Sequence, residues 1–214
     1  MDDMGTMYME MGRLGKAEQL ERDALALREA QNDSTAMGIS WMHLAMVSME
    51  QHHLTDAAMF AELAVSRLAQ QGNTATPQQK ITALIYLSHV RCAQGNYTDA
   101  IRNLKSAREI AEASYRPQNF FTAYVDFLLG HAYWESGNPE LASELMKKGT
   151  SGMQAELGWG HPTYVKAMKQ YAAFLKQTDR APEAAEVQRT IAQVRGARSR
   201  TDASQGQPMT VLPQ

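Results

Sequence analysis

The 214 residues carry a formal net charge of −2 and a sequence pI near 6.3, so no global charge attracts nucleic acid or an anionic membrane. The only cysteine, Cys92, excludes an internal disulfide and any site built from several cysteines. No apolar run approaches the roughly 20 residues of a membrane-spanning helix. The acidic start MDDMGTMYMEMG lacks the basic and apolar segments of a signal peptide. These features predict a protein of the cytoplasm.

The composition favours helix along the whole chain. Hydrophobic residues make up 44% of it, which is enough for a sizeable core. Beta-branched residues are scarce, whereas Ala, Gln, Glu, Leu and Met are abundant. An all-α fold is therefore expected.

One alanine recurs at a nearly constant interval, always five residues after a turn position. The intervals are 40, 43, 42 and 42 residues, which indicates an internal repeat. Small residues recur in the same frame on both sides, and they would let two helix backbones approach closely. The marker alanines are Ala17, Ala57, Ala100, Ala142 and Ala184, and the small residues seven before each turn are Gly5, Ala45, Ser88, Gly130 and Ala172.

In chain order, this frame predicts five helical hairpins, with a turn between the two helices of each. They cover 1–30 (turn at Gly12), 38–70 (turn at His52), 80–114 (turn at Gly95), 121–154 (turn at Gly137) and 164–195 (turn at Asp179). Because His52 and Asp179 replace the turn glycine, those two turns are expected to be less regular.

The two ends of the chain differ from the repeats. Residue 1 falls inside the first repeat's opening helix, which indicates a segment of a longer protein or a short first repeat. Residues 196–214 are polar, aperiodic and contain Gly, Ser and Pro, so a disordered tail is predicted. A second hypothesis is that Met209, Val211 and Leu212 of this tail occupy an apolar groove, with the terminal carboxylate near Lys169.

The pattern of a large residue, a small residue, a turn glycine and the marker alanine resembles the tetratricopeptide repeat over about residues 1–194. The period of about 42 residues is similar to the longer, kinesin light chain-like type, and GWGHPTYVKAM (158–168) resembles its linker between repeats. The resemblance implies a right-handed superhelical solenoid with a concave groove for protein partners. It implies neither catalysis nor a cofactor.

Helical spacing predicts which side chains line that groove. The middle repeats offer methionines, aromatic residues and histidines, which suit apolar anchors of a partner. The last repeat offers lysines, which suit an acidic segment or a C-terminal carboxylate. The candidate groove residues are Met42, Met46, Met49, Ile85, His89, Tyr124, Phe127, His131, Trp134, Lys166, Lys169 and Lys176. This set lacks the Asn and Lys/Arg pairs with which some relatives clamp a peptide carboxylate.

Catalytic and metal chemistry have little support. No phosphate-binding glycine loop and no HExxH motif occurs. His52 and His53 are adjacent and lie at a turn, without a second pair to complete a metal site. His89, Cys92 and His131 form a second metal hypothesis, but no fourth ligand is evident.

Two functions follow. The first is a non-catalytic scaffold that binds a peptide or protein segment in its concave groove, without nucleic acid or membrane. The second is a ligand-sensing, regulatory repeat segment of a larger signalling or transcription-regulating protein, which an adjacent effector domain would reveal.

Overall fold

The computed structural model describes residues 2–70 and 74–205, which form ten α-helices and no strand. The predicted all-α solenoid is confirmed. The helices are α1 (Asp2–Glu10), α2 (Leu14–Ala30), α3 (Ser34–Glu50), α4 (Leu54–Gln70), α5 (Pro77–Ala93), α6 (Tyr97–Ser114), α7 (Phe120–Glu135), α8 (Pro139–Leu157), α9 (Pro162–Gln177) and α10 (Ala181–Gln205).

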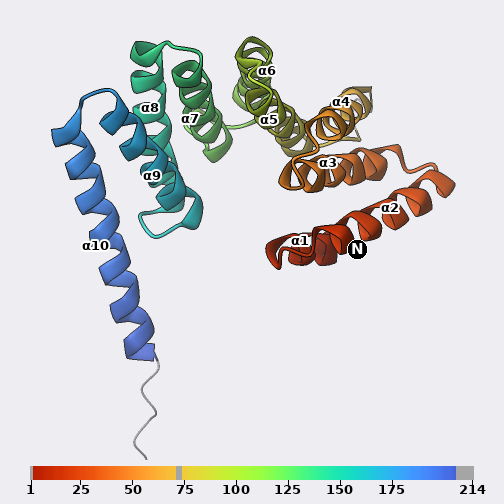
Figure 1. The fold of residues 1–214 in the computed structure, drawn as a ribbon, viewed down its shortest axis with the longest axis horizontal. Helices are drawn as coiled ribbons and strands as arrows, with labels where there is room; N and C mark the ends of the chain where they lie inside the picture. Colours follow the sequence, from red (N-terminus) through yellow and green to blue (C-terminus); the bar gives the residue numbers. More distant parts are fainter. Residues whose placement is uncertain (1, 71–73, 206–214) are drawn as a thin grey trace, which may run out of the picture.

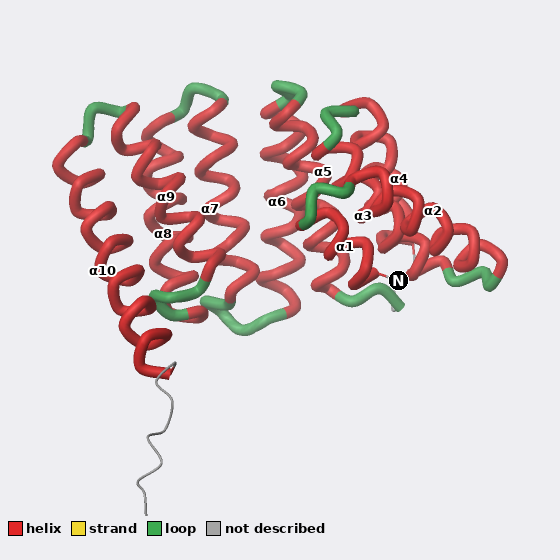
Figure 2. Tube along the Cα trace, turned by 60° about the horizontal axis from the view of Figure 1, so that its bottom comes forward, coloured by secondary structure: helices red, strands yellow, loops and turns green. Residues whose placement is uncertain are grey.

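Consecutive helices pair into antiparallel hairpins, and the hairpins follow one another along an arc (Figure 1). The odd-numbered helices lie on the inner side of the arc, and the even-numbered helices lie on the outer side. Seen from another direction, the helices stand side by side (Figure 2). Each helix contacts the next one in the chain, so the array grows by nearest-neighbour packing.

The two helices of each hairpin meet at the predicted alanine. Four of the marker alanines are 0% exposed and the fifth, Ala184, is 1% exposed. The small residues opposite them, from Gly5 to Ala172, are also buried. We call this contact between the marker alanine and the opposing small residue the hairpin seam. A Cβ atom on Gly130 would lie 2.8 Å from the backbone nitrogen of Met146, so the seam leaves no room for a larger side chain there.

All five hairpin turns have the same form. Three residues connect the helices, and the middle residue has a left-handed backbone with φ of 67° at Gly12, 62° at His52, 73° at Gly95, 84° at Gly137 and 57° at Asp179. The expectation of a less regular turn is wrong for His52, whose turn makes the same two backbone hydrogen bonds as the glycine turns, from His52 N to Met49 O and from His53 N to Ser48 O. The Asp179 turn keeps the backbone form but makes only the second of these bonds, from Arg180 N to Leu175 O, so it is less regular as expected. Both turn residues adopt a conformation that glycine adopts more readily, because the seam on either side holds the turn.

The first helices begin earlier than the sequence pattern indicates. They start at Ser34, Pro77, Phe120 and Pro162, up to four residues before the predicted positions. Pro77 and Pro162 open their helices instead of preceding them, which suits proline because the first helical turn needs no backbone N–H donor.

Helix α10 runs to Gln205, ten residues past the predicted end at 195. Residues 196–205 contain Gly196 but no proline, and nothing in them stops a helix. The structure thus has helix over residues 196–205 of the predicted tail. The rest of it, with the hypothesis that Met209, Val211 and Leu212 occupy a groove, lies outside the described residues.

Two buried carboxylates join neighbouring hairpins. Asp126 of α7 is 1% exposed, and its two oxygens lie 2.9 Å from Arg108 Nε of α6 and 2.8 Å from Lys148 Nζ of α8. Glu21 of α2 is fully buried, and its Oε1 lies 3.2 Å from His43 Nδ1 of α3. Because a buried carboxylate is unfavourable without a partner, both contacts constrain how one hairpin sits on the next.

Replacing Gly149 by alanine tests the close approach of α7 and α8. Its Cβ atom would lie 2.6 Å from both the Ala123 carbonyl oxygen and the Phe127 nitrogen. Backbone atoms cannot move aside as a flexible side chain can, so G149A should lower the free energy of unfolding by about 1–3 kcal/mol.

The control is G15A in α2, where a Cβ atom meets nothing within 4 Å. It should leave stability unchanged or raise it by up to about 1 kcal/mol. Urea unfolding of both variants compares them. Equal stability of the two variants would show that the α7–α8 contact is looser than described.

Candidate functional site

Helices α3, α5, α7 and α9 each have a stripe of partly or fully exposed side chains. In α7, the stripe is Tyr124, Leu128 and His131, whose i, i+4, i+7 spacing keeps them within about 60° around the helix. The second helix and the neighbouring hairpins cover the other sides, so the stripe lies on the inner face of the arc. We call the four equivalent sets the groove stripe: Ile39, His43, Met46; Thr82, Tyr86, His89; Tyr124, Leu128, His131; and Lys166, Gln170, Ala173.

Charged and titratable groups of different repeats influence one another electrostatically along this stripe. Burial, with smaller contributions from the Lys166 ammonium and from His131, lowers the pKa of His89 to about 4. These three groups come from α9, α7 and α5. Burial likewise lowers the pKa of His131, although Glu135 opposes the shift. At neutral pH, both imidazoles are therefore uncharged.

The tyrosines and the cysteine of this region are neutral as well. Burial raises the pKa of Tyr86, with Tyr124 adding to the effect, and it raises the pKa of Tyr124. Burial raises the pKa of Cys92 to about 11, and Glu135 contributes. The Tyr86 ring meets His89 edge-on, with centroids 6.4 Å apart. Thus α5 and α7 present a neutral surface that combines aromatic rings with hydrogen-bonding groups.

Eight of the twelve predicted groove residues fall into two groups. Met46, His89, Tyr124, His131 and Lys166 lie on the groove stripe. Met42, Ile85 and Phe127 are only 7%, 6% and 1% exposed, so their prediction as open groove residues is wrong. Each of them stands three positions after the first stripe residue, whereas the next stripe residue stands four positions after it. This shift of one position points their side chains toward the neighbouring helices.

The i+4 member of each stripe escaped the sequence prediction. His43, Tyr86, Leu128 and Gln170 occupy this position and are partly exposed. A strict i, i+4, i+7 pattern, counted from Tyr124, would have found them. The i, i+3 spacing used in the sequence prediction selected Phe127 and Met42, which are apolar. These residues belong to the buried core and not to the exposed stripe.

Trp134 and Met49 are at the margin of the groove. The Trp134 ring meets Phe174 of α9 edge-on at 5.6 Å and His131 at 5.5 Å, so it helps to hold hairpins four and five together. Truncating Trp134 would therefore reduce stability as well as any binding. Met49 packs against a small cluster that contains Ala57, Ala58 and Val90.

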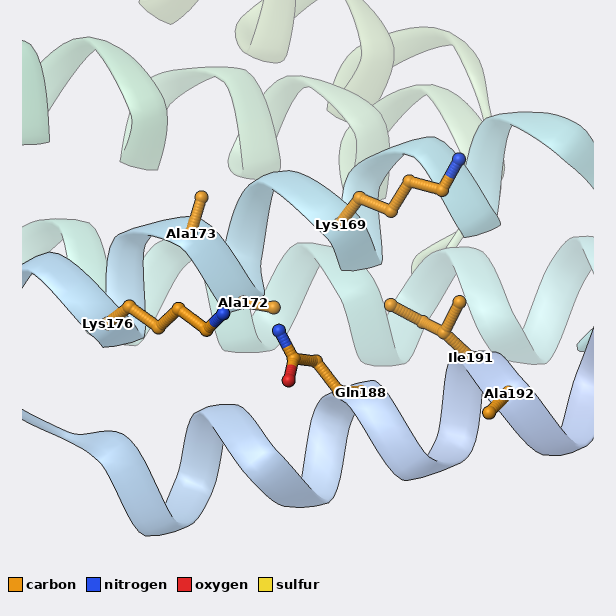
Figure 3. Close-up of a pocket in the computed structure, with 7 residues that line it drawn as sticks. All are labelled: Lys169, Ala172, Ala173, Lys176, Gln188, Ile191 and Ala192. Carbon is orange, nitrogen blue, oxygen red and sulfur yellow. The ribbon is translucent and has the colours of Figure 1, made fainter.

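Lys169 and Lys176 are not on the groove stripe but border it at Ala173. Both line a pocket of about 570 Å³ between α9 and α10, at the last hairpin (Figure 3). Its other lining residues are Ala172, Ala173, Gln188, Ile191 and Ala192. Lys166 is thus the only one of the three predicted lysines that belongs to the groove.

The residues described offer no metal chemistry. Among them, no group of three His, Cys, Asp or Glu side chains is arranged to hold a metal ion, and this holds for His89, Cys92 and His131 too. In the same part of the chain, no helix is both long and apolar enough to cross a membrane.

Comparison of the sequence with known protein families supports the internal repeat. Two family models, both of the tetratricopeptide repeat, match residues 79–155 and 1–30, which together make up half of the chain. The chain belongs to the tetratricopeptide repeat family. No curated protein sequence matches this tetratricopeptide repeat chain.

Several solved structures have a similar fold. A putative kinesin light chain from Podospora anserina with nearly identical TPR-like repeats is 18% identical, with a TM-score of 0.70 over 92% of this chain and 94% of that one. BtubC (BKLC) from P. vanneervenii is 19% identical, with a TM-score of 0.74 over 98% and 82%. The apo form of RapI is 13% identical, with a TM-score of 0.74 over 94% and 71%. The expected likeness to kinesin light chain-like repeats is confirmed for the fold.

The lowered pKa of His89 predicts a pH dependence of stability. The unfolded chain takes up this proton near pH 6.5, whereas the folded chain does so only near pH 4. Stability from this group is therefore complete above pH 6.5 and is lost as the pH falls towards 4. Between pH 7.5 and pH 5, the loss should be about 1–2 kcal/mol.

Urea unfolding of H89Q at the two pH values measures this term, because the variant should lose less stability than the wild type on acidification. H53Q, which changes an exposed histidine at a turn, is the control and should behave like the wild type. An unchanged pH dependence in H89Q would mean that His89 is not buried as described.

Proposed function

We propose that this tetratricopeptide repeat chain is a non-catalytic scaffold that binds a peptide or protein segment in its concave groove. The observation that carries the proposal is the groove stripe, which runs over α3, α5 and α7 as partly exposed Met, His, Tyr and Leu side chains. Burial keeps the histidines uncharged, so the surface can bury apolar side chains without leaving a charge unpaired.

The chemistry of the stripe defines the partner. Tyr86, Tyr124 and Leu128 offer rigid apolar contacts, and the tyrosine hydroxyls and imidazoles offer hydrogen bonds to a partner backbone. Lys166 of α9 supplies a positive charge whose field reaches His89. A segment with apolar anchors and an acidic residue or a C-terminal carboxylate near Lys166 matches this arrangement.

A second candidate function uses the same face. The chain covers 71% of RapI, a fold neighbour whose structure is of an apo form. This likeness of fold favours a ligand-sensing repeat segment within a larger regulatory protein. The full-length gene product decides between the two, because an adjacent effector domain favours the sensor.

The scaffold proposal predicts that the groove stripe carries the binding energy. The immobilised chain is used to retain partners, the shortest binding peptide is defined by truncation, and its Kd is measured. The double variant Y124A/L128A should weaken binding by at least about 2 kcal/mol, or roughly 30-fold, as truncated anchors do.

A matched control comes from the outer side of the array. Met59 and Leu63 of α4 are 47% and 40% exposed and have the same i, i+4 spacing, so M59A/L63A removes a similar apolar pair. The control should bind like the wild type. Equal losses in both variants, or no loss in Y124A/L128A while it remains folded in urea titration, would exclude the groove as the binding surface.

A further inference from the structure

The pocket between α9 and α10 occupies a defined place in the repeat. Moving back by 42 residues, Lys169 corresponds to Phe127, Lys176 to Trp134 and Gln188 to Met146. We call the surface formed by Lys169, Ala172, Lys176, Gln188 and Ile191 the end face. It is therefore the last hairpin's copy of a surface that exists in the hairpin before it.

In the fourth hairpin, part of that surface contacts the next first helix, α9, while the positions of Ala172 and Ile191 correspond to Gly130 and Gly149 between α7 and α8. Phe127 and Met146 are 1% and 0% exposed, and they share a core cluster with Tyr164 and Tyr171 of α9. Trp134 meets Phe174 of α9. Helix α9 thus shows how a helix lies on this type of surface.

The end face differs from its internal copy by its charge. Lys169 and Lys176 stand where the fourth hairpin has Phe127 and Trp134, and both are exposed. None of the described residues that line the pocket is acidic. The floor stays apolar, with Ala172 3% exposed and Ile191 partly buried.

This combination selects the chemistry of an occupant. An entirely apolar helix would bury two ammonium groups without partners, which is unfavourable. Carboxylates on the covering helix would neutralise them and leave its apolar side for the floor. Lys169 and Lys176 are seven residues apart on α9, so their Cα atoms are separated by about 10.5 Å along the helix axis.

We propose that the end face, which borders the groove stripe at Ala173, is a second docking site for an amphipathic helix of a partner protein that carries two carboxylates about two turns apart. The partner helix lies on α9 and α10 as α9 lies on α7 and α8. Its carboxylates pair with Lys169 and Lys176, and its apolar side chains cover Ala172 and Ile191.

The internal copy supplies a probe peptide. Phe174 of α9 contacts Trp134, and Lys176 is the equivalent of Trp134 in the last hairpin. A docked helix would therefore place the residue equivalent to Phe174 next to Lys176. The residue seven positions before Phe174 is Ala167. An acetylated, amidated and fluorescein-labelled peptide with the sequence of residues 162–177 and the changes A167E and F174E therefore places two carboxylates opposite the two lysines.

Fluorescence anisotropy of this peptide with the full chain should show saturable binding that weakens with salt. The charge reversal K169E/K176E should weaken binding at least tenfold. A second peptide with lysine at both changed positions should bind K169E/K176E more tightly than it binds the wild type. The groove variant Y124A/L128A should bind the first peptide like the wild type, so this test is independent of the proposed groove.

A charge-matched control, K16E/K105E, reverses two lysines that lie on α2 and α6, away from the end face. It should retain binding of the first peptide. The proposal is overturned by an absence of saturable binding up to about 1 mM peptide, which is the range of the weakest specific contacts. It is also overturned if both charge reversals weaken binding equally, or if the lysine peptide does not recover binding to K169E/K176E.

Discussion

The hairpin seam is the contact on which the rest of the structure depends. Each marker alanine is almost completely buried, and in the fourth hairpin a Cβ atom on Gly130 would lie 3.0 Å from the Ala142 carbonyl oxygen, so the two backbones approach closely there. Close packing of this kind fixes the rotation of both helices. Because the seam returns after 40–43 residues, it also fixes which side of each first helix faces inward. The groove stripe exists because these rotations agree from α3 to α9.

Sequence predicted the features that repeat and missed those that occur once. The five marker alanines and turn positions predicted the hairpins, since the same contact needs the same small residue each time. The buried pairs Asp126–Arg108 and Glu21–His43 have no counterpart in other repeats, so no periodic signal marks them. The candidate site was half right for a related reason. Phe127 and Tyr124 are both aromatic, and only packing shows that one lies in the core and the other on the groove stripe.

The position of each residue within the repeat also explains why His89 and His131 are partly buried and the lysines of the last hairpin are exposed. Burial on the inner face removes the charge of His89 and His131 at neutral pH, and Lys166 contributes to the shift of His89. Lys169 and Lys176 stand at positions that are covered in the preceding repeat, and here they are exposed. A neutral groove and a basic end face therefore arise from one repeated scaffold, and the two proposed sites would favour partners of different chemistry.

The central role of the hairpin seam is tested most directly by deleting one whole repeat period and measuring how the shortened chain unfolds. Deleting residues 97–138 joins Asn96 to Pro139, which recreates the Gly-Asn-Pro turn of the fourth hairpin and keeps Ala142 five residues after a turn glycine. The seam then forms between α5 and α8, and circular dichroism should show a helical protein that unfolds cooperatively in urea. Deleting residues 97–140 moves Ala142 by two positions and should abolish that cooperative transition. Loss of cooperative folding in the first deletion, or its retention in both, would contradict the account.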